Sequence, residues 1–291
     1  MHPLWILAIG TLITVLGIVR LRIGAFFALM LAALVVSFLA PGELADKVPR
    51  VIAALGLAAG KLALIIASAA VIGQCMTDSG AADRIVRAFL RLFGERRTPA
   101  ALMTSGFVLS VPVFFDTVFY LLVPLARSLH RRTRRHYLLY ILAITSGAAI
   151  THTLVPPTPG PLAVAEALSV DVGVMMLMGL LVGLPCSLLG LGIAHRMQAR
   201  FDLPMRPLPG AACDLDQPQE EDHTLPSLAA SLIPVALPVS LMACGTVVSM
   251  IAKTAPDGHW SRSWLPFTSI AGDPNIALLL AAAAAAVIYV L

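Results

Sequence analysis

Apolar segments long enough to cross a membrane recur along the chain. A helix needs about 20 residues to cross a hydrocarbon layer roughly 30 Å thick. Because lipid offers no partners to backbone groups, segments so uniformly apolar are expected to be helices and not barrel strands. The pattern therefore predicts an all-α polytopic membrane protein. Its expected spans are 3–19, 23–40, 51–73, 137–165, 172–194, 227–252 and 275–291, with a further apolar block at 99–127.

Composition and charge support this prediction and exclude several other classes. The chain of 291 residues is 58% hydrophobic and 12% charged, and its mean hydropathy is +0.89, which a water-soluble domain of this size does not reach. Its arginines cluster at the ends of apolar segments, so the net charge of +4 indicates membrane topology and not nucleic-acid binding. No metal-ligand spacing, cofactor motif or nucleophile with a positioned base is present in the sequence. We therefore expect no metal, no cofactor and no catalytic residues, and an enzyme is disfavoured.

The basic loops predict an orientation and a re-entrant hairpin. Arg20 and Arg22 follow the first span, and the positive-inside rule makes this loop cytoplasmic and the N-terminus periplasmic. The block 99–127 has basic flanks on both sides, "GERRTP" and "ARSLHRRTRRHY", so both its ends are expected in the cytoplasm. It is too short for two full spans of about 20 residues each. The prediction is a hairpin that turns near Pro112, which lacks a backbone donor. The alternative is one tilted span with an inverted loop charge.

The span 137–165 is expected to be a broken helix. Each proline inside a helix removes a hydrogen bond and costs about 3 kcal/mol or more, and half-helix ends expose backbone groups that attract ions. The nearby hydroxyl groups would suit a polyhydroxylated ligand. The alternative is that they bond only to carbonyls of their own helix. The prolines are Pro156, Pro157, Pro159 and Pro161, and the hydroxyl groups belong to Ser146, Thr151, Thr153 and Thr158.

Two titratable residues lie at the predicted membrane depth. Asp116 would cost about 2.5 to 3.5 kcal/mol at the centre of a membrane helix, so it is expected to face a cavity or a partner. It is the best single candidate for exchanging a coupling proton or contacting a substrate hydroxyl, although it could also cap the second helix of the hairpin. His152 could titrate near physiological pH or serve as a hydrogen-bonded scaffold.

Three stretches carry a resemblance to a known family. The segments "TDSGAADRIVRAFLRLFGERR", "GFVLSVPVFFDTVFYLLVPLA" and "ITHTLVPPTPGPLAVAEAL" resemble the gluconate permease family of proton symporters, within the ion transporter superfamily, over residues 50–195. The resemblance implies uptake of gluconate or a related small hydroxylated carboxylate with protons across the bacterial inner membrane. Many members have histidine where Thr158 stands, which leaves the exact substrate open. Carried over by position, the implied site residues are Pro112, Asp116, Thr117, Ser146, Thr151, His152, Thr153 and Thr158.

The resemblance also implies two inverted repeats. Residues 1–200 are expected to form the first repeat, the polar and acidic segment 201–226 a cytoplasmic linker, and residues 227–291 the start of a second repeat that is incomplete here. The expected protein partners are a second copy of the chain in a homodimer, or a second chain that supplies the missing repeat. The alternative function is therefore a non-transporting truncated or split-gene fragment of such a permease.

Overall fold

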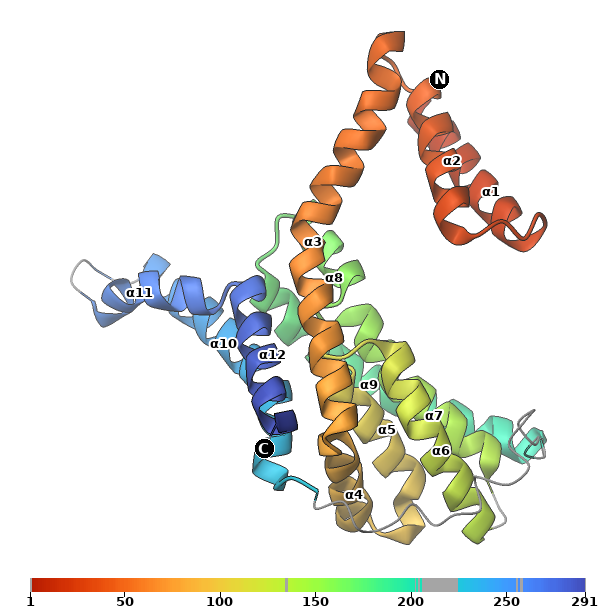
Figure 1. Cartoon of the computed structure of the whole chain (residues 1–291), viewed down its shortest axis with the longest axis vertical. Helices are drawn as coiled ribbons and strands as arrows, with labels where there is room; N and C mark the ends of the chain where they lie inside the picture. Colours follow the sequence, from red (N-terminus) through yellow and green to blue (C-terminus); the bar gives the residue numbers. More distant parts are fainter. Residues whose placement is uncertain are drawn as a thin grey trace. The chain divides into compact units, whose positions relative to one another are not determined.

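The computed structural model describes residues 2–133, 136–201, 203, 205, 225–254, 256 and 259–290. Within these ranges the regular structure is helical and contains no strand. The chain divides into two compact units, Met1–Ala63 and Leu64–Leu291, and each is described by itself. The prediction of an all-helical protein is confirmed (Figure 1).

The first unit contains two apolar helices and the start of a third. These are α1 (Pro3–Val19), α2 (Ala25–Leu39), the short 3₁₀ helix η1 (Leu44–Asp46) and the beginning of α3 (Lys47–Asp78). A Cβ atom added to Gly17 would lie 3.1 Å from Cβ of Ala28, so small residues bring α1 and α2 together. The buried Lys47 closes the connection between α2 and α3, because its Nζ donates to the Ala40 carbonyl and its own carbonyl accepts from Ser37 Oγ at 2.7 Å.

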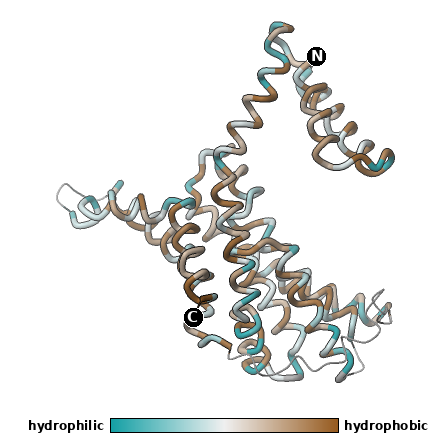
Figure 2. Tube along the Cα trace, viewed as in Figure 1, coloured by the Kyte–Doolittle hydropathy of each residue, from teal (hydrophilic) through white to brown (hydrophobic). Residues whose placement is uncertain are grey.

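The second unit contains the end of α3 and the remaining helices. Figure 2 shows that hydrophobic residues predominate along α12, as they do along α1 and α2 of the first unit. The helices are α4 (Ala81–Phe93), η2 (Glu95–Arg97), α5 (Thr98–Leu109), α6 (Phe115–Thr133), α7 (Tyr137–Leu154), α8 (Pro159–Ala167), α9 (Val172–Arg200), α10 (Leu228–Thr254), α11 (Trp260–Ala271) and α12 (Pro274–Val290).

Several of these helices are long and apolar enough to cross a membrane. By length and composition they are Leu44–Asp78, Tyr137–Ala167, Val172–Arg200 and Leu228–Thr254, and the pair α11 and α12, bent by 64°, could form a fifth span. The described chain is therefore a multi-pass membrane protein. The predicted spans correspond closely to observed helices, but the separate helix α11 was not predicted, because its sequence "WSRSWLPFTSIA" mixes polar residues with an internal proline.

The centre of the second unit is a close contact between α5 and α7. A Cβ atom added to Gly106 would lie 2.9 Å from the Ile144 carbonyl oxygen, and one added to Gly147 would overlap the Met103 carbonyl oxygen. The two backbones therefore touch where each helix carries a glycine, as small residues permit in membrane proteins. Helix α9 approaches α7 in the same manner, since a Cβ atom on Gly179 would overlap the Leu154 carbonyl oxygen.

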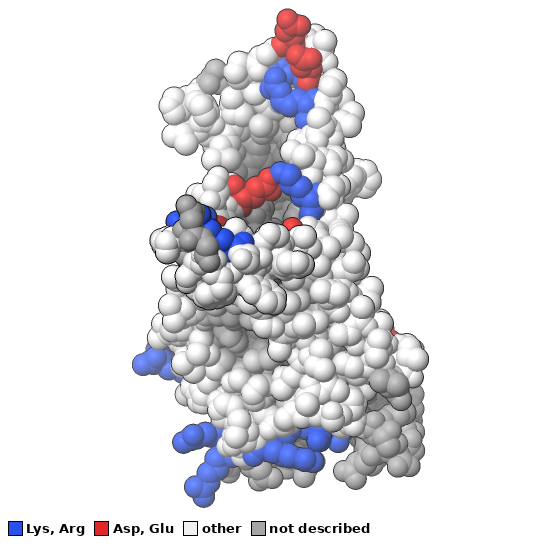
Figure 3. Space-filling view, turned by 90° about the vertical axis from the view of Figure 1, so that its left-hand side faces the viewer, with Lys and Arg blue, Asp and Glu red and all other residues white. Residues whose placement is uncertain are grey.

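Basic side chains gather at one end of the second unit. Figure 3 shows Lys and Arg residues at its lower end, where α4 lies in Figure 1. Arg84, Arg87 and Arg91 lie on α4, and Arg96 and Arg97 on η2. The positive-inside rule predicts that this end faces the cytoplasm. This orientation, the re-entrant course of the hairpin and the inverted repeats stay predictions, and most of the predicted linker 201–226 lies outside the described residues.

The α5–α7 contact yields a test of the packing. The Gly147→Ala variant should lose about 1 to 3 kcal/mol of unfolding free energy, because a methyl group cannot fit against the Met103 carbonyl and the Phe107 nitrogen, 2.9 Å away. Thermal unfolding in detergent would measure the loss. Gly192→Ala on α9 is the matched control, since no atom lies within 4 Å of its added Cβ. Equal melting temperatures for the two variants would contradict this account of the core.

Candidate functional site

The first helix break lies between α5 and α6. Helix α5 ends at Leu109, Ser110 caps it by donating its N–H to the Gly106 carbonyl at 3.0 Å, and α6 begins at Phe115. The buried Pro112 stands between the two helices, where its missing N–H leaves no donor unsatisfied. In Figure 1, α5 runs up to this break and α6 returns toward the end from which α5 came.

The second helix break lies between α7 and α8. Helix α7 ends at Leu154 and α8 begins at Pro159, so the interruption falls within the proline run that predicted it. The buried hydroxyl of Thr158 donates to the carbonyl oxygens of His152 at 2.7 Å and Val155 at 2.9 Å. The last carbonyls of a helix lack partners inside the helix. Thr158 therefore satisfies the exposed end of α7 and fixes the shape of the break.

The fold brings the two breaks together. The rings of Phe114, in the first break, and His152, in the last turn of α7, meet edge to face with centroids 6.0 Å apart. Val111 and Val155, one from each break, belong to the same buried cluster. The Asp116 carboxylate is near enough to act electrostatically on the His152 ring. The junction of the two breaks, residues 110–117 and 151–159, is the candidate site.

Four helix ends meet at this junction, and they differ in polarity. The C-terminal ends of α5 and α7 carry partial negative charge, whereas the N-terminal ends of α6 and α8 carry partial positive charge. Asp116 lies in the first turn of α6 and its side chain is exposed. Among the described residues, none forms a hydrogen bond or ion pair with its carboxylate. The junction therefore presents the positive N-terminal end of α8 and, at the start of α6, a carboxylate.

The predicted hydroxyl groups mostly serve the backbone. Ser146 Oγ donates to the Ala143 carbonyl at 3.0 Å, Thr151 Oγ1 to the Gly147 carbonyl at 3.0 Å, and Thr153 Oγ1 to the Ala149 carbonyl at 2.7 Å. Their hydrogen atoms are used within α7, as the alternative interpretation held. Their oxygen atoms can still accept a hydrogen bond, so a role in binding stays a prediction.

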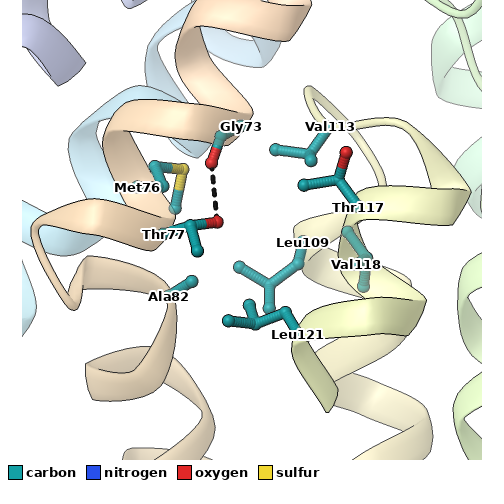
Figure 4. Close-up of a pocket in the computed structure, with 9 residues that line it drawn as sticks. All are labelled: Gly73, Met76, Thr77, Ala82, Leu109, Val113, Thr117, Val118 and Leu121. Atoms are coloured by element: carbon teal, nitrogen blue, oxygen red, sulfur yellow. Dashed lines mark hydrogen bonds between the residues drawn. The ribbon is translucent and has the colours of Figure 1, made fainter. Parts of the chain in front are cut away.

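Two of the predicted residues face other spaces. Ser146 lines a groove of about 310 Å³ between α7 and α9. Thr117 lines a cavity of about 10 Å³ between α3 and α6, with its methyl group toward Gly73 and its hydroxyl pointing away (Figure 4). A space of that size holds at most about one water molecule. Of the predicted residues, Pro112, Asp116, Thr117, Thr151, His152, Thr153 and Thr158 thus belong to the junction, although Thr117 lines this separate cavity, and Ser146 lies outside the junction.

Ser110 belongs to the junction, although sequence reasoning did not select it. Its side chain is fully buried, and its Oγ has no hydrogen-bond partner. Nδ1 of His152 is likewise buried and without a partner. The signal in the sequence that could have selected Ser110 was its hydroxyl group inside the apolar run before Pro112. In the described part of the chain, no group of three or more His, Cys, Asp or Glu residues could hold a metal ion.

The chain is similar to known permeases over almost all of its length. A model of the family described as GntP family permease matches residues 2–291. The chain is 30% identical to the high-affinity gluconate transporter of Escherichia coli K12 (96% of this chain, 61% of the relative). It is 32% identical to the gluconate permease of Pseudomonas aeruginosa (94% and 60%) and 29% identical to the Gnt-II system L-idonate transporter of E. coli K12 (96% and 61%). No solved structure matches.

The comparisons extend the resemblance that the sequence motifs indicated. The chain spans about 60% of the length of the curated relatives it matches. The match of the family model nevertheless covers both units of the described structure and both helix breaks. The chain therefore belongs to the GntP family of permeases.

Proposed function

We propose that this chain takes part in proton-coupled uptake of gluconate, or of a related small hydroxylated carboxylate, across the bacterial inner membrane. The observation that carries the proposal is the junction of two helix breaks, where the ring of Phe114 meets that of His152 and the Asp116 carboxylate acts electrostatically on His152. Non-helical backbone at membrane depth is tolerated where protein buries it or where it lines a watery cavity. Discontinuous helices that meet near the bilayer midplane are the usual substrate and ion sites of secondary transporters.

The names of the relatives support this class of substrate. Those cited are described as gluconate or L-idonate transporters, and both acids combine a carboxylate with several hydroxyl groups. Membership of a permease family argues for transport and against an enzyme. The family match along the chain also does not favour the alternative of a non-transporting fragment.

The polarity of the helix ends suggests how the substrate is oriented. In the proposal, the substrate carboxylate faces the N-terminal end of α8, where the helix dipole favours an anion, because the start of α6 already carries the Asp116 carboxylate. Asp116 takes up the coupling proton, because its exposed carboxylate has no competing partner among the described residues. His152, on which this carboxylate acts electrostatically, is a further polar group of the junction.

Vesicle uptake tests the proposal directly. Proteoliposomes that contain the full chain should accumulate labelled gluconate when the outside is made acidic, because proton entry drives the symport. A protonophore should abolish the accumulation. Vesicles in which a pH gradient produces no more uptake than protein-free vesicles would refute the proposed coupling.

Replacing Asp116 tests its role in coupling. In the Asp116→Asn variant the internal gluconate concentration should no longer exceed the external one under a pH gradient, since an amide cannot carry the proton. Exchange of labelled for unlabelled gluconate should persist, because the helix breaks are intact. Accumulation equal to that of the wild type, with the same pH dependence, would exclude Asp116 as the coupling group.

The matched control is Asp273→Asn. Asp273 also stands at the start of a helix, α12, where its carboxylate accepts from the Asn275 backbone N–H at 2.9 Å. Asparagine can replace aspartate in such a cap. Accumulation by this variant should match the wild type, which separates a specific effect of Asp116 from the general loss of an acidic group.

A further inference from the structure

Two buried polar atoms at the junction have no hydrogen-bond partner. One is Oγ of Ser110, whose side chain is 0% exposed, and the other is Nδ1 of His152. A buried polar group that leaves water without gaining a partner destabilises the folded protein. Such groups are therefore rare and commonly mark a bound molecule or a functional role.

The two atoms come from opposite sides of the same junction. Ser110 is the C-cap of α5 and directly precedes Val111, which shares a buried cluster with Val155 of the second break. His152 contacts the ring of Phe114, four residues after Ser110. The first break therefore passes over the end of α7, and both unpartnered atoms belong to the place where the breaks meet.

Ser105 on α5 shows that a buried serine in this helix can find a hydrogen-bond partner. Ser105 is also 0% exposed, but its Oγ donates to the Ala101 carbonyl at 2.8 Å. Back-bonding of this kind is the ordinary solution for a buried serine in an apolar helix. Ser110 lies beyond the last turn of α5 and its hydroxyl does not use that solution.

We propose that Ser110 is a substrate-binding residue whose hydroxyl binds a hydroxyl group of the transported sugar acid, and that Nδ1 of His152 binds the substrate at the same junction. This inference rests on the proposed function. A serine hydroxyl both donates and accepts, and an imidazole nitrogen does one or the other, so either atom can pair with a substrate hydroxyl, which can also do both. Both atoms are buried, so in the proposal the breaks separate for substrate to reach them.

The same surroundings disfavour the substrate carboxylate at this position. Ser110 and His152 lie at the C-terminal ends of α5 and α7, which carry partial negative charge, and the Asp116 carboxylate is close to His152. A second negative group here would be repelled. The carboxylate of the substrate is accordingly assigned to a helix N-terminus, and hydroxyl groups further along the carbon chain to Ser110 and His152.

The test compares Ser110→Ala with Ser105→Ala in proteoliposomes. Loss of one hydrogen bond to substrate should raise KM for gluconate roughly 3- to 10-fold in Ser110→Ala, whereas Ser105→Ala should keep the wild-type KM. The rise in melting temperature on adding gluconate should be smaller in Ser110→Ala than in the wild type. For the deoxy analogue of gluconate that lacks the bound hydroxyl, Ser110→Ala and wild type should have equal KM values.

The outcomes distinguish this inference from the proposed function. If wild-type vesicles take up gluconate but Ser110→Ala retains its KM and its ligand-induced thermal shift, the inference is wrong and the proposed function stands. Higher stability of ligand-free Ser110→Ala, with unchanged KM, would identify the hydroxyl as a packing defect. If the wild type neither transports gluconate nor is stabilised by it, the proposed function and the inference about Ser110 are both wrong. Ser110→Cys replaces the hydroxyl by a thiol, which is a much weaker hydrogen-bonding group, and should raise KM as well, which covers a folding failure of the alanine variant.

Discussion

The backbone contact between α5 and α7 is the constraint on which the rest of the second unit depends. Gly106 and Gly147 let the two helices touch along their length, and no larger residue fits at Gly147. This contact holds the two helices against each other, and the segments that follow them come together in contacts between Phe114 and His152 and between Val111 and Val155. The two breaks meet because the helices that precede them are locked together. Without that contact, Asp116 and His152 would be polar residues in unrelated segments.

Polar groups in this protein are distributed according to the demands of the backbone. Most hydroxyl groups on α7 donate to a carbonyl of their own helix, and Thr158 satisfies the carbonyls that the second break exposes. In lipid, unsatisfied backbone groups are too unfavourable to leave unpaired. Against this background, Ser110 Oγ and His152 Nδ1 stand out as polar atoms that the backbone does not use. In the proposed function, these atoms are available to bind the substrate.

Much of the fold could be predicted from the sequence, because membrane helices follow from local properties. The apolar segments gave the spans, the proline run located the second break, and Pro112 with its basic flanks located the first. Helix α11 was not predicted, because its mixed composition gives no clear periodic signal. Ser110 was not selected either, since one serine in an apolar run does not reveal whether its hydroxyl is satisfied.

The sequence by itself determined that the chain is a helical membrane protein with two interrupted helices and an acid beside one of them. Hydrophobic segment length and proline placement act within a few residues of chain, so they can be read without knowing the fold. Only the tertiary structure decided which polar residues share a site. It brought together the two breaks that carry Asp116, His152 and Ser110, and it placed Ser146 and Thr117 at other spaces. That arrangement depends on how closely helices distant in sequence approach each other, which is set by packing at Gly106 and Gly147, about one helical turn before the site.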